Sequence, residues 1–134
     1  MSTRLIPPIT DLTQPYWDAT RRGEFVMQQC KACTHTIFPP RSNCSNCGSK
    51  ELLWQPVSGK GVIYTYTIAH RPPHPVLVDQ CPLAIAVVEL DEGPRMITNV
   101  IGCNPNEVKI GMKVKVAFEA IDDSDEVLPV FEPV

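Results

Sequence analysis

Apolar residues recur at strand-like spacing through the second half of the chain. The five predicted strands span residues 62–68, 83–90, 96–101, 113–119 and 127–131. In the fourth of these strands, Val114, Val116 and Phe118 alternate with polar residues, which is typical of a strand with one buried face. A turn-forming sequence at residues 91–94 separates the second strand from the third. The segment between the third and fourth strands, around residues 104–108, is long enough for one helical turn. This order predicts a five-stranded OB-type barrel.

The first half of the chain begins with an extended arm and a short helix, which is expected over residues 14–22. Thr13 can cap the start of this helix, Pro15 suits its first turn, and Gly23 can end it. Because its apolar face is short, the helix must pack on the rest of the protein to persist. We therefore expect a mainly β protein with three regions: an arm and helix at 1–23, a cysteine-rich unit at 24–56 and an OB-fold domain at 57–134.

Composition and charge narrow the classes of function. The 134 residues suit one domain, or a small domain with an appendage. The net charge is −3, with +3 over residues 1–60 and −6 over residues 61–134. An acidic barrel repels the phosphate backbone of a nucleic acid. Nucleic-acid binding is therefore kept as an alternative function and is not the leading one. No apolar run nears the ~20 residues of a membrane helix, and the first residues lack the features of a secretory signal, so the expected location is the cytoplasm.

Four of the six cysteines form two C-x-x-C pairs, the strongest motif in the chain. Cys30 and Cys33 precede a ten-residue segment, and Cys44 and Cys47 follow it. Each pair places two thiolates on one side of a tight turn, and two such turns complete a tetrahedral site. Four cysteine ligands leave no open position on the metal, so the pattern indicates one structural Zn²⁺ in a zinc ribbon. Thr34 stands where such a turn usually has glycine, which is expected to affect the shape of the first turn.

Other interpretations of the cysteines stay open. Iron in the same ligand set would make an electron carrier, and two disulfides would need an oxidising compartment that nothing in the sequence indicates. Cys81 and Cys103 are interpreted as small core residues. The alternative for them is a thiolate nucleophile, which would need His70 or His74 as a basic partner. The chain shows no phosphate-binding loop, dinucleotide fingerprint or nucleophile elbow, so we do not expect it to be catalytic alone.

The segment from His70 to Pro82 is long for a strand connection and contains four prolines. It is either a solvated loop stiffened by proline or a contact surface for a partner or an anionic ligand. His70, Arg71 and His74 make it locally basic, and the Arg71 guanidinium can pair with a phosphate or a carboxylate. Five aromatic residues suggest either a core or a base-stacking platform, and we expect a core: Tyr16, Trp17, Trp54, Tyr64 and Tyr66.

The ordered set of motifs resembles a known family. The motifs are Tyr16-Trp17, the two C-x-x-C pairs, Phe38-Pro-Pro-Arg41 between them, Ser58-Gly-Lys-Gly-Val-Ile-Tyr-Thr-Tyr-Thr, Ala86-Val-Val-Glu-Leu-Asp-Glu-Gly-Pro-Arg and Gly111-Met-Lys-Val. Together they are similar to the acyl-CoA-associated OB-fold proteins, in which a rubredoxin-like zinc ribbon precedes a C-terminal OB fold. The resemblance covers residues 14–133.

This resemblance implies a function that the residues alone do not reveal. Members of the family act as non-catalytic accessory subunits of thiolase-like aldolases, thiolases or acyltransferases in lipid or steroid metabolism, or associate with hot-dog-fold acyl-CoA hydratases. It thus implies a hetero-oligomer whose partner supplies the chemistry, with a CoA ester expected at the interface. On this hypothesis Tyr16 and Trp17 dock the partner, while His70, Arg71 and His74 border the route of the CoA thioester. The residues that carry over as zinc ligands are Cys30, Cys33, Cys44 and Cys47.

Overall fold

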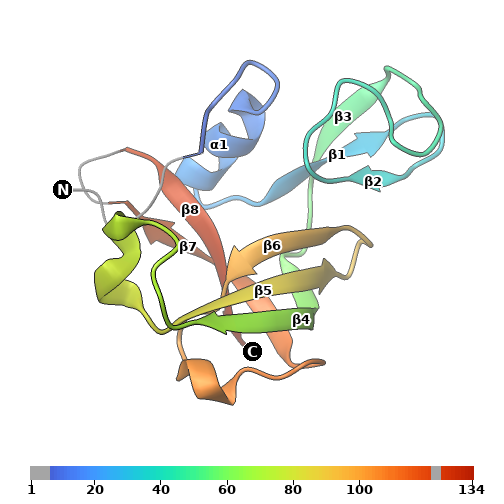
Figure 1. Ribbon diagram of the computed structural model, residues 1–134. Helices are drawn as coiled ribbons and strands as arrows, with labels where there is room; N and C mark the ends of the chain where they lie inside the picture. Colours follow the sequence, from blue (N-terminus) through green and yellow to red (C-terminus); the bar gives the residue numbers. More distant parts are fainter. Residues whose placement is uncertain (1–6, 122–124) are drawn as a thin grey trace.

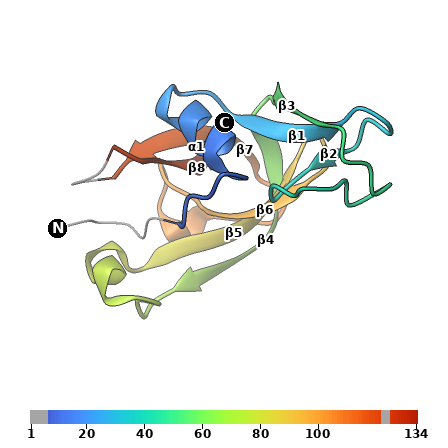
Figure 2. The ribbon, with the colours of Figure 1, turned by 90° about the horizontal axis from the view of Figure 1, so that it is seen from above.

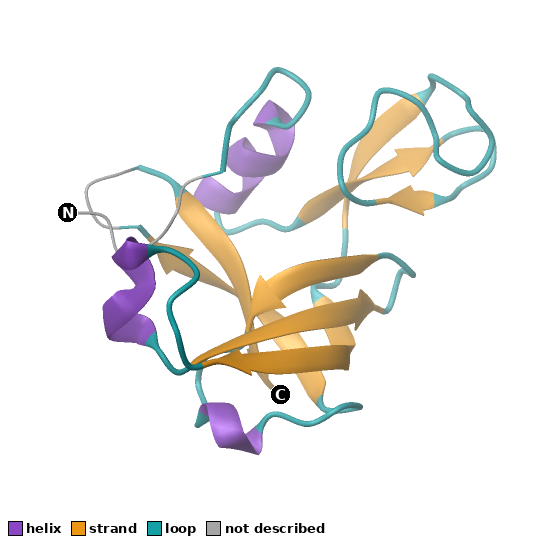
Figure 3. Ribbon diagram, in the orientation of Figure 1, coloured by secondary structure: helices purple, strands orange, loops and turns teal. Residues whose placement is uncertain are grey.

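A computed structural model describes residues 7–121 and 125–134, which form two antiparallel sheets and one α-helix (Figure 1). The smaller sheet has the strand order β2-β1-β3, and the larger has the order β6-β5-β4-β7-β8. Most of the regular structure is strand. The helical segments lie near the start of the chain and in the connections between strands (Figure 3). Among these residues, no helix has the length and apolar character needed to cross a membrane.

The helix α1 (Gln14–Arg21) confirms the predicted N-terminal helix. Thr13 occupies the N-cap position, but its side chain does not cap the helix, contrary to the prediction. Instead, the Thr13 hydroxyl oxygen accepts a hydrogen bond of 2.9 Å from the backbone N–H of Thr10. At the other end Gly23 has a φ of 75° and its N–H donates to the carbonyl of Thr20 over 3.0 Å, which ends the helix as expected.

The small sheet contains the cysteine-rich unit. Its strands are β1 (Val26–Cys30), β2 (Thr36–Ile37) and β3 (Leu52–Pro56), with β1 in the centre. Gln28 on β1 is 4% exposed, and its side-chain amide donates to the Arg41 carbonyl over 2.9 Å and accepts from the Arg41 N–H over 2.7 Å. This pair of bonds satisfies a buried amide and fixes the chain between the two cysteine pairs to the sheet.

The large sheet closes into the predicted barrel. Its strands are β4 (Lys60–Ala69), β5 (Leu83–Leu90), β6 (Arg95–Asn99), β7 (Lys113–Ala120) and β8 (Val127–Pro133). The 3₁₀ segments η1 (Pro75–Gln80) and η2 (Pro105–Glu107) lie in the connections before β5 and before β7. Central strand β4 pairs with β5 and β7, and Val100 after β6 forms a parallel bridge with Phe131 on β8. The bridge brings the two outer strands together, giving a nearly closed five-stranded barrel of the OB type.

One apolar cluster joins the barrel to the N-terminal helix. Phe131 is fully buried inside the barrel, and its ring meets that of Phe25 edge-on at 6.2 Å between centroids. The Phe25 ring in turn lies 6.1 Å from the ring of Tyr16 on α1. The helix therefore packs beside β8 (Figure 2) and contributes to the core of the barrel. This contact confirms that so short a helix is stabilised by packing on the rest of the protein.

The predicted fold class is confirmed, and the differences from the predicted elements are local. All five predicted barrel strands are present, as are the tight turn after β5 and a helical turn before β7, where the Asn104 side chain accepts from the Asn106 N–H over 2.9 Å. The three strands of the small sheet and the segment η1 were not among the predicted elements. Strands β1, β2 and β3 are two to five residues long, and η1 contains proline, so none of them shows the alternation over many residues that identified the barrel strands.

Candidate metal centre and partner-facing residues

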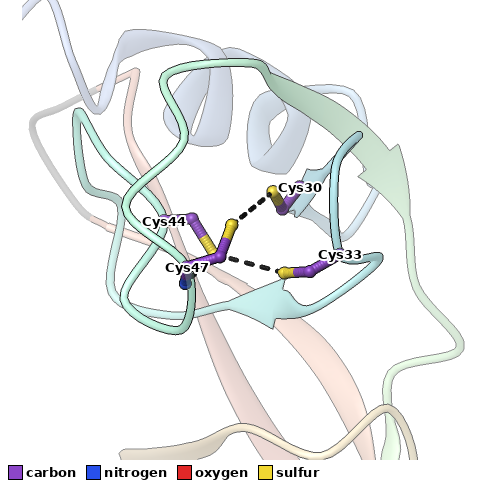
Figure 4. A group of neighbouring side chains, drawn as sticks. All are labelled: Cys30, Cys33, Cys44 and Cys47. Carbon is purple, nitrogen blue, oxygen red and sulfur yellow. Dashed lines mark hydrogen bonds between the residues drawn. The ribbon is translucent and has the colours of Figure 1, made fainter.

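Two similar turns face each other at the far end of the small sheet (Figure 4). The first follows β1, and the second lies between β2 and β3. In the first turn the N–H of Thr34 donates to the carbonyl of Cys30 over 2.9 Å, and in the second the N–H of Gly48 donates to the carbonyl of Cys44 over 2.9 Å. Each turn is thus closed by the same backbone hydrogen bond between its first cysteine and the residue four positions later.

The four predicted ligands come together. Sulfur atoms within 4.8 Å of one another belong to Cys30, Cys33, Cys44 and Cys47. The Sγ atoms of Cys30 and Cys47 are 3.6 Å apart, as are those of Cys33 and Cys44. Sulfurs at Zn–S distances of ~2.3 Å around a tetrahedral ion would be separated by about 3.8 Å. The donor set and its spacing therefore fit a structural zinc ion with no open coordination position, as the sequence predicted.

Hydrogen bonds to sulfur favour the charged form of one of the four cysteines, Cys33. The N–H of Asn46 donates to Cys44 Sγ over 3.3 Å, and its side-chain amide donates to Cys33 Sγ over 3.5 Å. The bond from the Asn46 side chain is the largest of the effects that lower the pKa of Cys33 to about 6. Cys33 is therefore largely a thiolate at neutral pH, the form in which cysteine binds zinc.

The unusual residue of the first turn adopts the conformation that glycine would. Thr34 has a φ of 64°, and Gly48 has a φ of 79° at the matching position of the second turn. A β-branched residue is rarely found in this left-handed region, because its Cβ crowds the following carbonyl. The departure from glycine at Thr34 thus keeps the shape of the turn and introduces backbone strain.

The two helix aromatics that were predicted to dock a partner are mostly buried within this chain. Tyr16 is 4% exposed and Trp17 is 7% exposed, and their rings meet edge-on at 5.1 Å. Burial raises the pKa of the Tyr16 phenol, which stays neutral. Both side chains line an apolar groove beside β6.

The other aromatic residues divide between core and surface. Trp54 is half-buried and packs against the barrel core, as expected. The expectation of core positions is wrong for Tyr64 and Tyr66, which are 49% and 38% exposed. Among the described residues, strand β4 pairs with β7 only over residues 60–62, and no other described strand continues the sheet on that side of its second half. The Tyr64 ring instead contacts the Arg95 guanidinium, 3.9 Å from the ring centroid.

The predicted basic loop is exposed. His70, Arg71 and His74 all lie on the surface in the connection that leaves β4 and leads into η1. The structure therefore places these three side chains on one accessible segment at the end of β4. Their role toward a ligand or a partner stays a prediction.

The two remaining cysteines are both half-buried. The Cys81 thiol donates to the Leu77 carbonyl over 3.6 Å, and Cys103 packs against the barrel core. Burial, together with the charge of Glu107, raises the pKa of the Cys103 thiol. A raised pKa keeps the thiol protonated, which suits a small core residue better than a nucleophile.

Comparisons with known proteins agree with both parts of the structure. Residues 17–52 match the family described as "ChsH2, rubredoxin-like zinc ribbon domain", and residues 54–119 match "ChsH2, C-terminal OB-fold domain". A "DUF35 domain-containing scaffold protein" of Methanocaldococcus jannaschii is 39% identical over 73% of this chain and 70% of its own length. The chain belongs to the DUF35 family.

Two further similarities are to proteins whose names include an enzyme. A solved chain described as "Ltp2-ChsH2(DUF35) aldolase" superposes with a TM-score of 0.84 at 36% identity, covering 96% of this chain and 98% of that one. A "Probable enoyl-CoA hydratase alpha subunit" of Thermomonospora curvata is 38% identical over 94% of this chain. The present chain spans 39% of the length of that hydratase subunit.

Proposed function

We propose that this protein is a non-catalytic accessory subunit of an enzyme complex that processes acyl-CoA esters. The observation that carries the proposal is the match to the Ltp2-ChsH2(DUF35) aldolase chain, which extends over nearly the full length of both chains. Relatives named as scaffold proteins and as a hydratase alpha subunit support the same function. A scaffold that recurs beside different enzymes is expected to contribute surface and stability rather than reacting groups.

The partner in this proposal supplies the catalytic groups. It is a thiolase-like aldolase, thiolase or acyltransferase, or a hot-dog-fold hydratase, and the aldolase and hydratase named among the relatives support this range. The four-thiolate site of this chain supports the division of labour, because a metal enclosed by four sulfurs has no position for a substrate or a water. When bound, the zinc supplies folding energy to the ribbon.

The basic loop is proposed to border the CoA ester at the interface of the complex. His70, Arg71 and His74 are exposed in a half of the chain that is otherwise acidic, with a charge of −6 over residues 61–134. A planar guanidinium binds phosphate through paired hydrogen bonds, so Arg71 is suited to the phosphate groups that every CoA ester carries.

The proposal is tested by capturing the complex from source cells with a tagged form of the full chain. We expect one enzyme of the thiolase or hydratase class in stoichiometric amount, identified by mass spectrometry and retained through gel filtration. A chain with the tag at the other end controls for interference with docking. Recovery of the chain alone would contradict the proposal, and recovery with nucleic acid would contradict it and favour the alternative of a strand-binding module.

A further inference from the structure

Strand β6 presents backbone hydrogen-bonding groups on the side that faces away from β5. The N–H of Leu90 donates to Pro94 O, and the N–H of Val100 donates to Ala84 O, and both pairs belong to the single register that joins β5 and β6. In an antiparallel ladder, bonded and non-bonded pairs alternate. The pairs Glu89–Arg95 and Val87–Ile97 are therefore non-bonded, and Arg95 and Ile97 direct their N–H and C=O groups away from β5.

No strand pairs with that side of β6 at Arg95 or Ile97 in the described part of the chain. The first pairing there is the bridge between Val100 and Phe131, beyond the end of the strand. The Ile97 side chain is 73% exposed, although isoleucine is a residue that folding normally buries. An accessible strand edge with an exposed aliphatic side chain is a template for another strand, and proteins usually protect such edges.

An apolar groove of about 220 Å³ runs along this edge. Its walls are the N-terminal arm at Pro7, α1, the segment after β2, and strands β6 and β8, and the larger side chains that line it include Tyr16, Trp17, Phe38, Met96, Ile97 and Leu128. Ile97 also lines a second apolar hollow of about 280 Å³ on the outer face of the barrel, together with Ile85 and Val87. Ile97 thus lies between two apolar hollows, one on each face of β6.

We propose that an extended segment of the partner enzyme binds as an added β-strand along β6. This inference rests on the proposed function and specifies how the partner is held. The outward-facing N–H and C=O groups of Arg95 and Ile97, with which no described strand pairs, call for a backbone in extended conformation, since only such a backbone offers donors and acceptors at the same spacing. The groove is walled by α1 and by Phe38 of the ribbon, and its volume admits a few side chains rather than a second barrel.

The two hollows define the sequence that the added strand should have. Side chains alternate between the faces of a sheet, so the residue opposite Met96 points into the groove, and its neighbours point to the outer face. Apolar side chains are expected opposite Met96 and opposite Ile97. A polar or acidic side chain is expected opposite Arg95, whose guanidinium already contacts Glu89 over 2.9 Å.

Substitution of Ile97 by proline separates this mode of binding from simple apolar contact. Ile97→Pro removes an N–H that points away from β5, so the β5–β6 ladder keeps its hydrogen bonds. Ile97→Lys keeps the N–H and removes the apolar side chain from both hollows. The matched control is Ile110→Lys, because Ile110 is 68% exposed and lines neither hollow. Retained zinc content and an unchanged pattern of barrel amide resonances report that each variant folds.

The probe is the partner enzyme that co-purifies with the tagged wild-type chain, titrated onto each variant. We expect Kd to rise at least about tenfold for Ile97→Pro and Ile97→Lys and less than about twofold for Ile110→Lys. In the wild-type complex, the amides of Arg95 and Ile97 should exchange with deuterium more slowly than in the free chain.

Three results would overturn the inference. If the complex forms and Ile97→Pro binds as tightly as wild type, or if the two amides gain no protection, the partner docks elsewhere and only this inference fails. If the free chain dimerises through β6 with the same amides protected, a second copy is the occupant. If no complex with an enzyme forms, both the proposed function and this inference fail.

Discussion

The ribbon and the barrel of this protein reach a stable structure by different means. The barrel and α1 share a cluster of buried apolar side chains that includes Ile63, Val88, Val114 and Phe131. The ribbon has a separate buried cluster which, among the described residues, consists of Cys30, Ile37 and Cys44. Two of its three members are metal ligands, so the ribbon depends on zinc for what the barrel obtains from burial of apolar surface. One chain of 134 residues thus combines two sources of folding energy, and Met27 on β1 of the small sheet belongs to the apolar cluster that the barrel shares with α1.

The largest effect is expected from removal of a zinc ligand. Cys44→Ser should abolish zinc binding and unfold the ribbon, because structural zinc sites contribute about 10–16 kcal/mol to folding in small units. The barrel should remain folded, since its cluster does not contain the thiols. Zinc content by mass spectrometry and hydrogen exchange of the two sheets measure both results.

Cys103→Ser is the matched control, because Cys103 lies against the barrel core and away from the metal site. It should retain one zinc per chain and a protected ribbon. Loss of protection in both sheets of Cys44→Ser would show that the two regions fold as one unit and would contradict the comparison.

The next largest effect is expected from loss of a buried aromatic side chain in the barrel. Phe131 is fully buried, and its ring contacts the ring of Phe25. Phe131→Ala should lower the free energy of unfolding of the barrel by about 3–5 kcal/mol, through lost burial and the cavity that it leaves. Denaturant unfolding followed by Trp fluorescence measures the change. Zinc stoichiometry should stay at one, and a loss of zinc in the folded variant would contradict the independence of the two regions.

The smallest effect tests the strain in the first cysteine turn. Thr34→Gly should stabilise the zinc-bound ribbon by about 1 kcal/mol, because glycine adopts a positive φ without the crowding of a β-branched side chain. A gain of this size raises zinc affinity about fivefold, measured by competition with a chelator.

Gly48→Ala is the reverse substitution at the matching position of the second turn. A Cβ there would meet nothing within 4 Å, so its effect reports the backbone conformation alone. It should lower zinc affinity by a similar factor. An unchanged affinity in both variants would show that the left-handed conformation carries no cost in these turns.

Most of the metal site and the barrel could be predicted from the sequence, because both follow from short-range patterns. The spacing of the C-x-x-C pairs specifies four converging thiolates, and the alternation around Val114 specifies a strand with one buried face. Each of these features is determined by residues that are close together in the chain, so a local sequence pattern is enough to predict it.

The features that escaped prediction depend on distant parts of the chain. Tyr16 and Trp17 are buried by Phe25 and the barrel, while Tyr64 and Tyr66 stay exposed because β7 leaves the second half of β4 uncovered. The open edge of β6 likewise arises from where β8 meets β6, at Val100, which no local pattern records. The residues of these surfaces could therefore be identified only from the structure.

The measurement that tests the central claim most directly is acyl-CoA turnover by three samples: the isolated chain, the isolated partner enzyme and the reconstituted complex. The account predicts no turnover by this chain alone, and turnover or stability of the partner that rises when this chain is added in equal amount. Turnover by the isolated chain, or a partner whose activity and stability are the same with and without it, would contradict an accessory role.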